Sequence, residues 1–251
     1  MNCVIYGDES GVIGQDRFFC IGVVGTRYSQ RVDEQLKQLR KNANFFGEVT
    51  YKSSDDRRAL CAIKWMDWVF SGQKLIKFKV LLKDSKNFNV SYFKDNKYDT
   101  GAAQLAYCQT YREVLKNFAD FKDDKKYFVY HRIDLKKMKV DEHLGNHING
   151  LEQKDCYSYS TTKKRPHSEE YTLHAELLQL TDLLTSSFRG LVCAVNDDGN
   201  NKSWVKRALH QNLLFHLSGL KPAIKDERNF YWTAYQPFTD QSFVLYNWKP
   251  R

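Results

Sequence analysis

The first ten residues place two adjacent acids at the end of a β-rich run. Cys3–Tyr6 favours a strand, Asp8 and Glu9 follow, and Ser10–Gly11 breaks the pattern. The sequence predicts that this strand pairs with Phe18–Val24 in an antiparallel hairpin, because both runs are β-rich and the turn region between them is short. Asp is disfavoured inside strands. Asp8 therefore either bonds to nearby backbone in a turn or belongs to a site with other acids.

Strands and helices alternate along the rest of the chain. Strands are predicted at 76–82, 127–133, 156–162 and within 230–248, with a short extended piece at 46–52; helices are predicted at 29–44, 55–70, 100–121, 140–151, 173–193 and 204–217. Ser29 is the expected N-cap of the first helix, and Ser53, Ser54 and Asp55 are the candidate N-caps of the second. This alternation predicts an α/β fold with one mixed central sheet flanked by helices, and the opening hairpin argues against a wholly parallel sheet.

Composition places the chain among globular proteins. Of its 251 residues, 42% are hydrophobic and 14% aromatic, which is enough to build a substantial core. No internal repeat and no long linker divides the chain, so we expect a single domain over 1–251. The six cysteines are scattered without a Cys-x-x-Cys pair, which favours buried free thiols over a zinc ribbon. No apolar run reaches membrane-spanning length, so we expect a cytoplasmic protein without membrane association.

The formal net charge of +9 indicates a polyanionic partner. Basic residues cluster at three places, 136–139, 163–165 and 202–207. Such a distribution favours DNA or RNA as the ligand, and the alternative is a basic, soluble surface with no such partner.

A second acid, Asp182, lies within the most regular helical pattern, 173–193. Leu177, Leu180, Leu184 and Phe188 form one apolar face. Another face carries a narrow polar stripe, made of Glu176, Gln179, Asp182, Ser186 and Arg189. Because the surrounding sequence is strongly apolar, Asp182 is expected to be partly buried, where an unpaired carboxylate is costly unless it is paired or binds a metal. The alternatives are an exposed polar stripe and an ion pair between Asp182 and Arg189, which the sequence places about two helical turns apart, far for direct contact.

Two more acids are candidates for the same site. Asp134 follows the strand 127–133, and Glu48 lies beside the extended piece at 46–52. Each has an ordinary alternative, a turn or cap acid for Asp134 and an exposed surface acid for Glu48. Carboxylates that share divalent ions are the usual ligands in metal-dependent phosphodiester hydrolysis. Three or four acids at strand ends and on one helix could meet the need of magnesium for oxygen ligands.

Two motifs together resemble a known family. Tyr6-Gly7-Asp8-Glu9-Ser10-Gly11 and the later Leu178-Gln179-Leu180-Thr181-Asp182-Leu183-Leu184 are similar to domain-of-unknown-function family thirty-eight hundred, which has an N-terminal Asp-Glu-Ser-Gly and a late Gln-x-x-Asp helix. The resemblance implies a ribonuclease H-like fold and a metal-dependent nuclease of bacteria or their mobile elements, some members standing beside defence genes. An antiviral defence role is thus expected.

The resemblance also implies roles for single residues. The ligands of Mg2+ or Mn2+ would be Asp8, Asp182, Asp134 and Glu48. Supporting or substrate-contacting residues would be Glu9, Gln179, Lys52 and Glu176. His131 and Arg132 stand where the strand acid could equally fall, which puts Asp134 in question.

Two other functions stay open. One is a non-catalytic member of the same fold that binds nucleic acid or a protein partner, including a second copy of the chain. The other is a hydrolase that uses His or Cys. His143 and His147 have the spacing of a metal pair, but no Glu follows His143 as His-Glu-x-x-His requires.

Overall fold

The computed structural model describes most of the predicted elements. The described residues are 2–13, 15–51, 55–71, 75–84, 102–116, 125–131, 155–159, 175–196, 203–218, 237–238, 241–242 and 244–247. Lys52, Asp134, the predicted helix at 140–151 and the basic clusters at 136–139 and 163–165 lie outside them.

The opening hairpin is confirmed. Strand β1 (Asn2–Ser10) pairs with β2 (Phe18–Thr26) in antiparallel orientation, with Tyr6 opposite Val24 and Asp8 opposite Gly22. The pairing continues to Ser10, so both acids lie on paired strand rather than in the turn.

The central sheet is mixed, as predicted. Its strand order is β5-β4-β1-β2-β3-β8. The added strands are β3 (Lys77–Asp84), antiparallel to β2; β4 (Lys125–His131), parallel to β1; β5 (Asp155–Tyr159), parallel to β4; and β8 (Val244–Asn247), parallel to β3. Two short strands, β6 (Pro237–Phe238) and β7 (Gln241–Ser242), pair separately.

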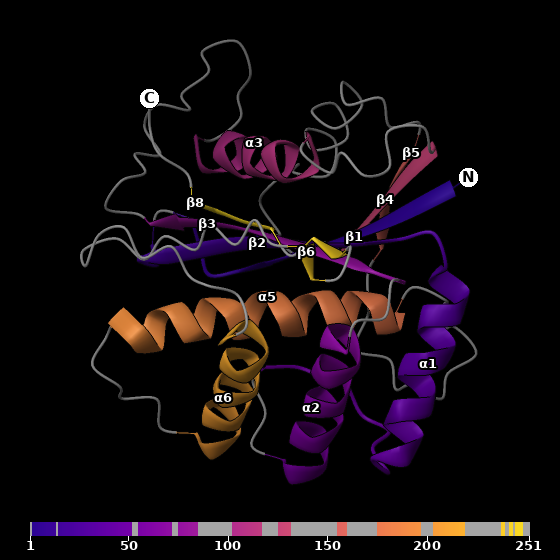
Figure 1. Cartoon of the computed structure of the whole chain (residues 1–251). Coiled ribbons are helices and arrows are strands. Elements are labelled where there is room, and N and C mark those ends of the chain that lie inside the picture. The colour runs from indigo at the N-terminus through magenta and orange to yellow at the C-terminus, as the bar shows by residue number, and fades with distance from the viewer. Residues whose placement is uncertain are drawn as a thin grey trace.

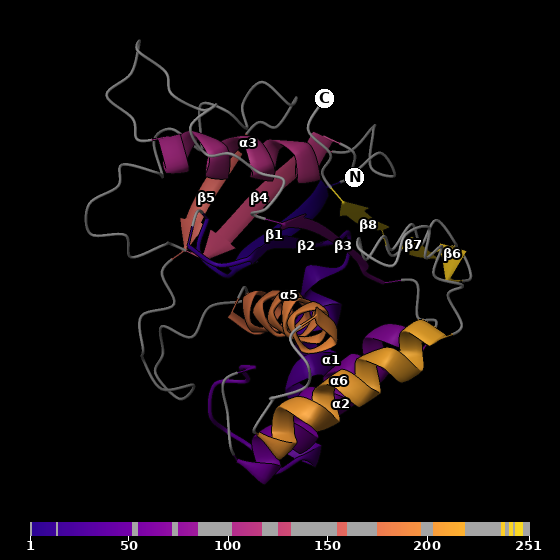
Figure 2. The same ribbon diagram turned by 90° about the vertical axis from the view of Figure 1, so that its left-hand side faces the viewer.

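Helices cover both faces of the sheet (Figure 1). The helices are α1 (Ser29–Asn42), α2 (Asp56–Phe70), α3 (Ala102–Lys116), α5 (Ala175–Asn196) and α6 (Trp204–Ser218). Of the described helices, α3 covers one face, while α5 lies flat against the other, with α1, α2 and α6 packed beyond it. Figure 2 shows α5 nearly end-on between the sheet and these outer helices.

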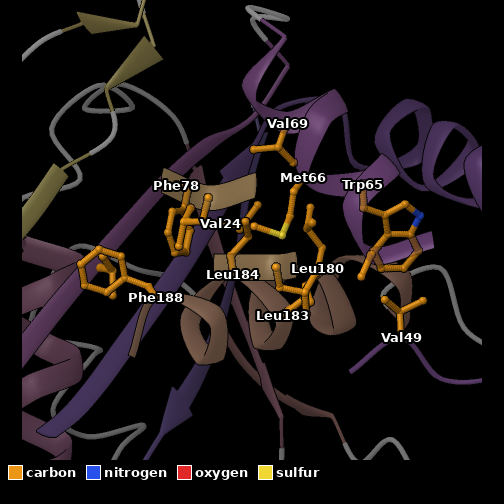
Figure 3. Close-up of a cluster of buried hydrophobic side chains, with 14 of the residues drawn as sticks. Val24, Val49, Trp65, Met66, Val69, Phe78, Leu180, Leu183, Leu184 and Phe188 are labelled. Atoms are coloured by element: carbon orange, nitrogen blue, oxygen red, sulfur yellow. The ribbon is translucent and has the colours of Figure 1, made fainter. Parts of the chain in front are cut away.

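Helix α5 is the centre of the main core (Figure 3). Its residues Leu180, Leu183 and Leu184 are fully buried beside Met66 and Val24 of neighbouring elements. Fully burying one such side chain is worth about 1.5–3 kcal/mol. Apolar residues extend beyond the single predicted face, which explains why so little of this helix reaches solvent.

Gly22 allows α5 to approach β2 closely. A Cβ at that position would collide with Oγ1 of Thr185. The same strand position lies opposite Asp8. The close approach therefore brings α5 down onto the sheet at the level of the first acid.

Three local predictions have different outcomes. Asp55 is the N-cap of α2, and its Oδ1 accepts from the backbone N–H groups of Arg57 and Arg58. Ser29 is not a cap: it is the first residue of α1, and the capping position belongs to Tyr28. The described part of the predicted extended piece, 46–51, is irregular and joins no strand, because side chains rather than a neighbouring strand bond its backbone.

The cysteine prediction is confirmed where side chains are described. Cys3, Cys20, Cys61 and Cys108 are buried free thiols, and Cys193 is a half-buried one. Among the helices described, none combines the length and apolarity needed to cross a bilayer.

Candidate active site

Asp8 and Asp182 come together although they lie far apart in sequence. Asp8 is near the end of β1, and α5 packs across β1 and β2 with Asp182 in its middle. Both side chains are half-buried. The pKa of the Asp8 carboxyl is raised well above its usual range, first by burial and then by the negative charges of Asp182 and Glu9.

The third acid, Glu9, turns toward the other side of the sheet. Successive strand residues point to opposite faces, and the hydroxyl of Tyr111 on α3 donates to Glu9 Oε2 at 3.1 Å. Burial raises the pKa of Glu9 to about 7, the hydroxyls of Tyr107 and Tyr111 oppose that rise, and Asp182 adds to it. Burial also raises the pKa of both tyrosines, so both hydroxyls keep their protons, and that of Tyr111 donates to Glu9.

Two hydroxyls connect the strand end to the helix. Ser186 donates to Asp182 Oδ1 at 2.9 Å, and its oxygen lies 3.2 Å from that of Ser10. Asp8 Oδ1 accepts from the backbone N–H of Glu9 at 2.8 Å. These contacts orient both aspartates.

Glu176 and Gln179 are bound to Arg40, near the C-terminal end of α1. Nε and Nη2 of Arg40 donate to the two carboxylate oxygens of Glu176 at 3.1 and 2.5 Å. Gln179 Oε1 accepts from Arg40 Nη2 at 3.0 Å and from the backbone N–H of Val49 at 2.8 Å, and Arg40 also donates to the carbonyl of Gly47. Glu176 and Gln179, which were predicted to support the site, thus form a buried hydrogen-bond network with Arg40. This network, called the clamp below, holds the backbone of the segment 43–51 against α5.

Glu48 lies between the two clamped backbone positions, and its own side chain is exposed. None of the described influences on the pKa of Asp8 or Glu9 comes from it. On β4, Gly7 is paired with Tyr130, so the next residue along β4, beside Asp8, is His131 rather than an acid. Among the residues that the structure describes, no group of three or more His, Cys, Asp and Glu side chains has metal-binding geometry.

Sequence reasoning missed several residues of this site. Tyr107 and Tyr111 belong to the buried face of α3, and nothing in their spacing connects them with Glu9. Ser186 carries a usable signal, because it follows Asp182 by one helical turn on the predicted polar stripe. Arg40 resembles an ordinary basic residue in the last turn of an amphipathic helix.

Comparisons with known proteins add little. No protein-family model matches the chain, and no curated protein matches it. Among solved structures, the chain is similar to one in the complex of PCNA and RNase HII from Archaeoglobus fulgidus, at 9% identity and a TM-score of 0.44 over 87% of this chain and 89% of that one. That similarity is too weak to support an assignment.

Proposed function

We propose that the protein is a divalent-metal-dependent nuclease whose site is built on Asp8 and Asp182. The observation that carries the proposal is that these two carboxylates meet near the end of β1, where the charge of Asp182 helps to raise the pKa of Asp8. Groups with strongly perturbed pKa values that gather at one place are candidates for a functional site.

The contrast with Glu176 strengthens the proposal. This chain neutralises one buried acid on the same helix with a two-point contact to Arg40. No cation is among the described influences on the pKa of Asp8 or Glu9. A fold that keeps carboxylates together at such a cost has a use for them, and binding a cation is the most direct one.

The donor set suits magnesium or manganese. Carboxylate oxygens are the ligands these ions prefer, and Mg2+ usually keeps several waters beside one or two carboxylates. Asp8 and Asp182 would hold the ion, with Asp134 and Glu48 as the further predicted ligands. A divalent ion at such a site supplies a water of lowered pKa and stabilises charge on the leaving oxygen. Ser186 and Tyr111 would keep the acids oriented.

The architecture supports the ribonuclease H-like fold that the resemblance implies. In the described sheet, β1, β2 and β3 are consecutive antiparallel neighbours and β4 returns parallel to β1, with helices on both faces. Nucleic acid is the proposed partner, because the chain carries a formal net charge of +9. A role in bacterial defence or a mobile element is part of the proposal.

Cleavage assays test the proposal. Purified protein would be incubated with single- and double-stranded DNA and RNA in Mg2+, in Mn2+ and in EDTA. We expect cleavage with metal and none in EDTA. Asp8→Asn and Asp182→Asn should each lower the rate by at least about 100-fold, since each removes a charge that holds the ion.

Matched variants keep the result interpretable. Glu34→Gln removes one carboxylate from the exposed side of α1 and should leave the rate unchanged, and Glu48→Gln tests the weaker ligand assignment. Full activity of Asp8→Asn would refute the site. A folded protein that cuts none of the substrates would favour the non-catalytic nucleic-acid- or protein-binding alternative.

A further inference from the structure

The polar stripe of α5 divides into two halves with different partners. Glu176 and Gln179, in the first half, are buried and bound to Arg40. Asp182, Ser186 and Arg189, in the second half, are half-buried and face the end of β1 and the turn after it. The second half therefore presents a carboxylate, a hydroxyl and a guanidinium on one side of the helix.

Arg189 is held in place by the hairpin turn. Its Nε donates to the carbonyl of Phe18 at 2.7 Å, and its Nη2 lies 3.3 Å from Asp16 Oδ2. Gly11 makes room for it: the glycine has φ +87°, and a Cβ there would lie 2.6 Å from Nε. The guanidinium thus rests directly on the backbone that follows Ser10.

These contacts leave much of the guanidinium available. Arginine has five N–H donors in a fixed fork, and the described contacts use one on Nε and one on Nη2. The side chain keeps 25% of its surface exposed, and the side chain of its partner Asp16 keeps 40%. An exposed ion pair of this kind contributes at most about 1 kcal/mol, so it neutralises the arginine only weakly.

Arg189 lies at a distance from Asp8 and Asp182 that one nucleic-acid strand can span. Arg189 follows Asp182 by about two helical turns, or about 10 Å along the helix axis. Successive phosphates of one strand in a duplex advance about 3.4 Å along its axis. A strand with one phosphate at Asp8 and Asp182 would thus bring a phosphate about three positions along the strand to Arg189.

We propose that Arg189 binds a backbone phosphate about three positions along the strand from the one that is cleaved at Asp8 and Asp182, an inference that rests on the proposed function. Arginine suits the role because its planar fork matches two phosphate oxygens and cannot lose its charge. The contact positions the strand and reads no sequence.

Binding in the absence of metal tests the inference apart from catalysis. Fluorescence anisotropy of a labelled oligonucleotide with the full chain in EDTA would be measured over a series of KCl concentrations. Each lost phosphate contact should reduce the slope of log K against log salt by about 0.7–0.9. We expect that reduction for Arg189→Gln, together with a several-fold weaker affinity. Arg189→Lys, which keeps the charge, should retain most of the slope.

Two controls separate phosphate binding from other effects. Arg57→Gln removes one charge from an exposed position on α2 and should leave the slope close to wild type. Asp16→Asn removes the ion pair but keeps the guanidinium, so binding should stay equal or become tighter. If Asp16→Asn weakens binding as much as Arg189→Gln does, the arginine acts by supporting the turn and the inference is overturned.

Failure of this inference is distinguishable from failure of the proposed function. Suppose that the protein cleaves with metal but that Arg189→Gln and Arg57→Gln give the same slope of log K against log salt. The inference would then be overturned and the nuclease proposal would stand. If Arg189→Gln reduces the slope of log K against log salt but the protein cleaves no substrate, the result supports phosphate binding by Arg189 and counts against the nuclease proposal. Circular dichroism and a thermal melt of each variant confirm that the compared proteins are folded.

Discussion

Arg40 and Glu176 form a buried, two-point ion pair that joins α1 to the first turn of α5. The side chains expose only 6% and 1% of their surface, and the same guanidinium also reaches Gln179 and the carbonyl of Gly47. The pair therefore determines where the segment 43–51 lies against the helix that carries Asp182.

Breaking this pair should destabilise the fold strongly. Removing one partner leaves the other charge buried and uncompensated, so Glu176→Ala should lower the free energy of unfolding by about 3–5 kcal/mol. Urea denaturation would measure it. The exposed Arg207→Ala on α6 is the control and should stay within about 0.5 kcal/mol of wild type. A Glu176→Ala protein as stable as wild type would show that the clamp contributes nothing.

Neutralising Asp8 should have the opposite effect on stability. Its pKa is higher in the folded state than in the unfolded chain, so folding binds protons and stability falls as pH rises through that range. Asp8→Asn removes the penalty and should stabilise the protein by on the order of 1 kcal/mol at pH 8, while abolishing metal-dependent cleavage.

Thermal melts of wild type and Asp8→Asn in EDTA, at pH 8 and at pH 5, test whether the substitution stabilises the protein. The gain from Asp8→Asn should be larger at pH 8, where the wild-type carboxyl group is more fully ionised. A loss of stability at pH 8 would mean that the Asp8 charge is compensated in the fold.

His210 should make the fold sensitive to acid. Burial, helped by the nearby Lys206, lowers its pKa from 6.5 to about 4, and its Nε2 lies 2.7 Å from the hydroxyl of Tyr51. The unfolded chain therefore takes up this proton first as pH falls. Stability should drop between about pH 6.5 and 4, by at most about 1.4 kcal/mol per pH unit for one proton.

Urea titrations across that pH range measure the effect. His210→Gln should flatten the profile, whereas His216→Gln, on the same helix, should leave this part of it in place. If His210→Gln leaves the dependence of stability on pH unchanged, His210 is not the group that makes the fold sensitive to acid.

Gly22 should be intolerant of a side chain because of Thr185. Gly22→Ala would force β2 and α5 apart and should cost about 1–3 kcal/mol, the usual range for overpacking. Thr185→Ala removes the colliding Oγ1, so the double variant should be more stable than the sum of the single changes predicts. A double-mutant cycle by urea denaturation tests this, and strict additivity would contradict a direct clash.

The local patterns of the sequence predicted the elements well. The β-rich runs on both sides of a short turn predicted the β1–β2 hairpin, and the apolar spacing of Leu177, Leu180 and Leu184 predicted α5. Asp55 was among the three candidate caps, Ser53, Ser54 and Asp55, because capping depends on groups only a few residues away. The described part of the extended piece, 46–51, joins no strand, because its backbone groups bond to the side chains of Arg40 and Gln179. Local propensity carries no information about such partners.

The sequence by itself determined that Asp8 lies near the end of a strand and that Asp182 lies on a mostly apolar helix. Only the tertiary structure decided which members of the polar stripe serve the site. Glu176 and Gln179 face Arg40, whereas Asp182 faces Asp8 and Arg189 rests on the turn after Ser10. The physical reason is that helical spacing places all five residues on one side of α5, while the partner that each one meets depends on how α1 and the β1–β2 hairpin pack against that side.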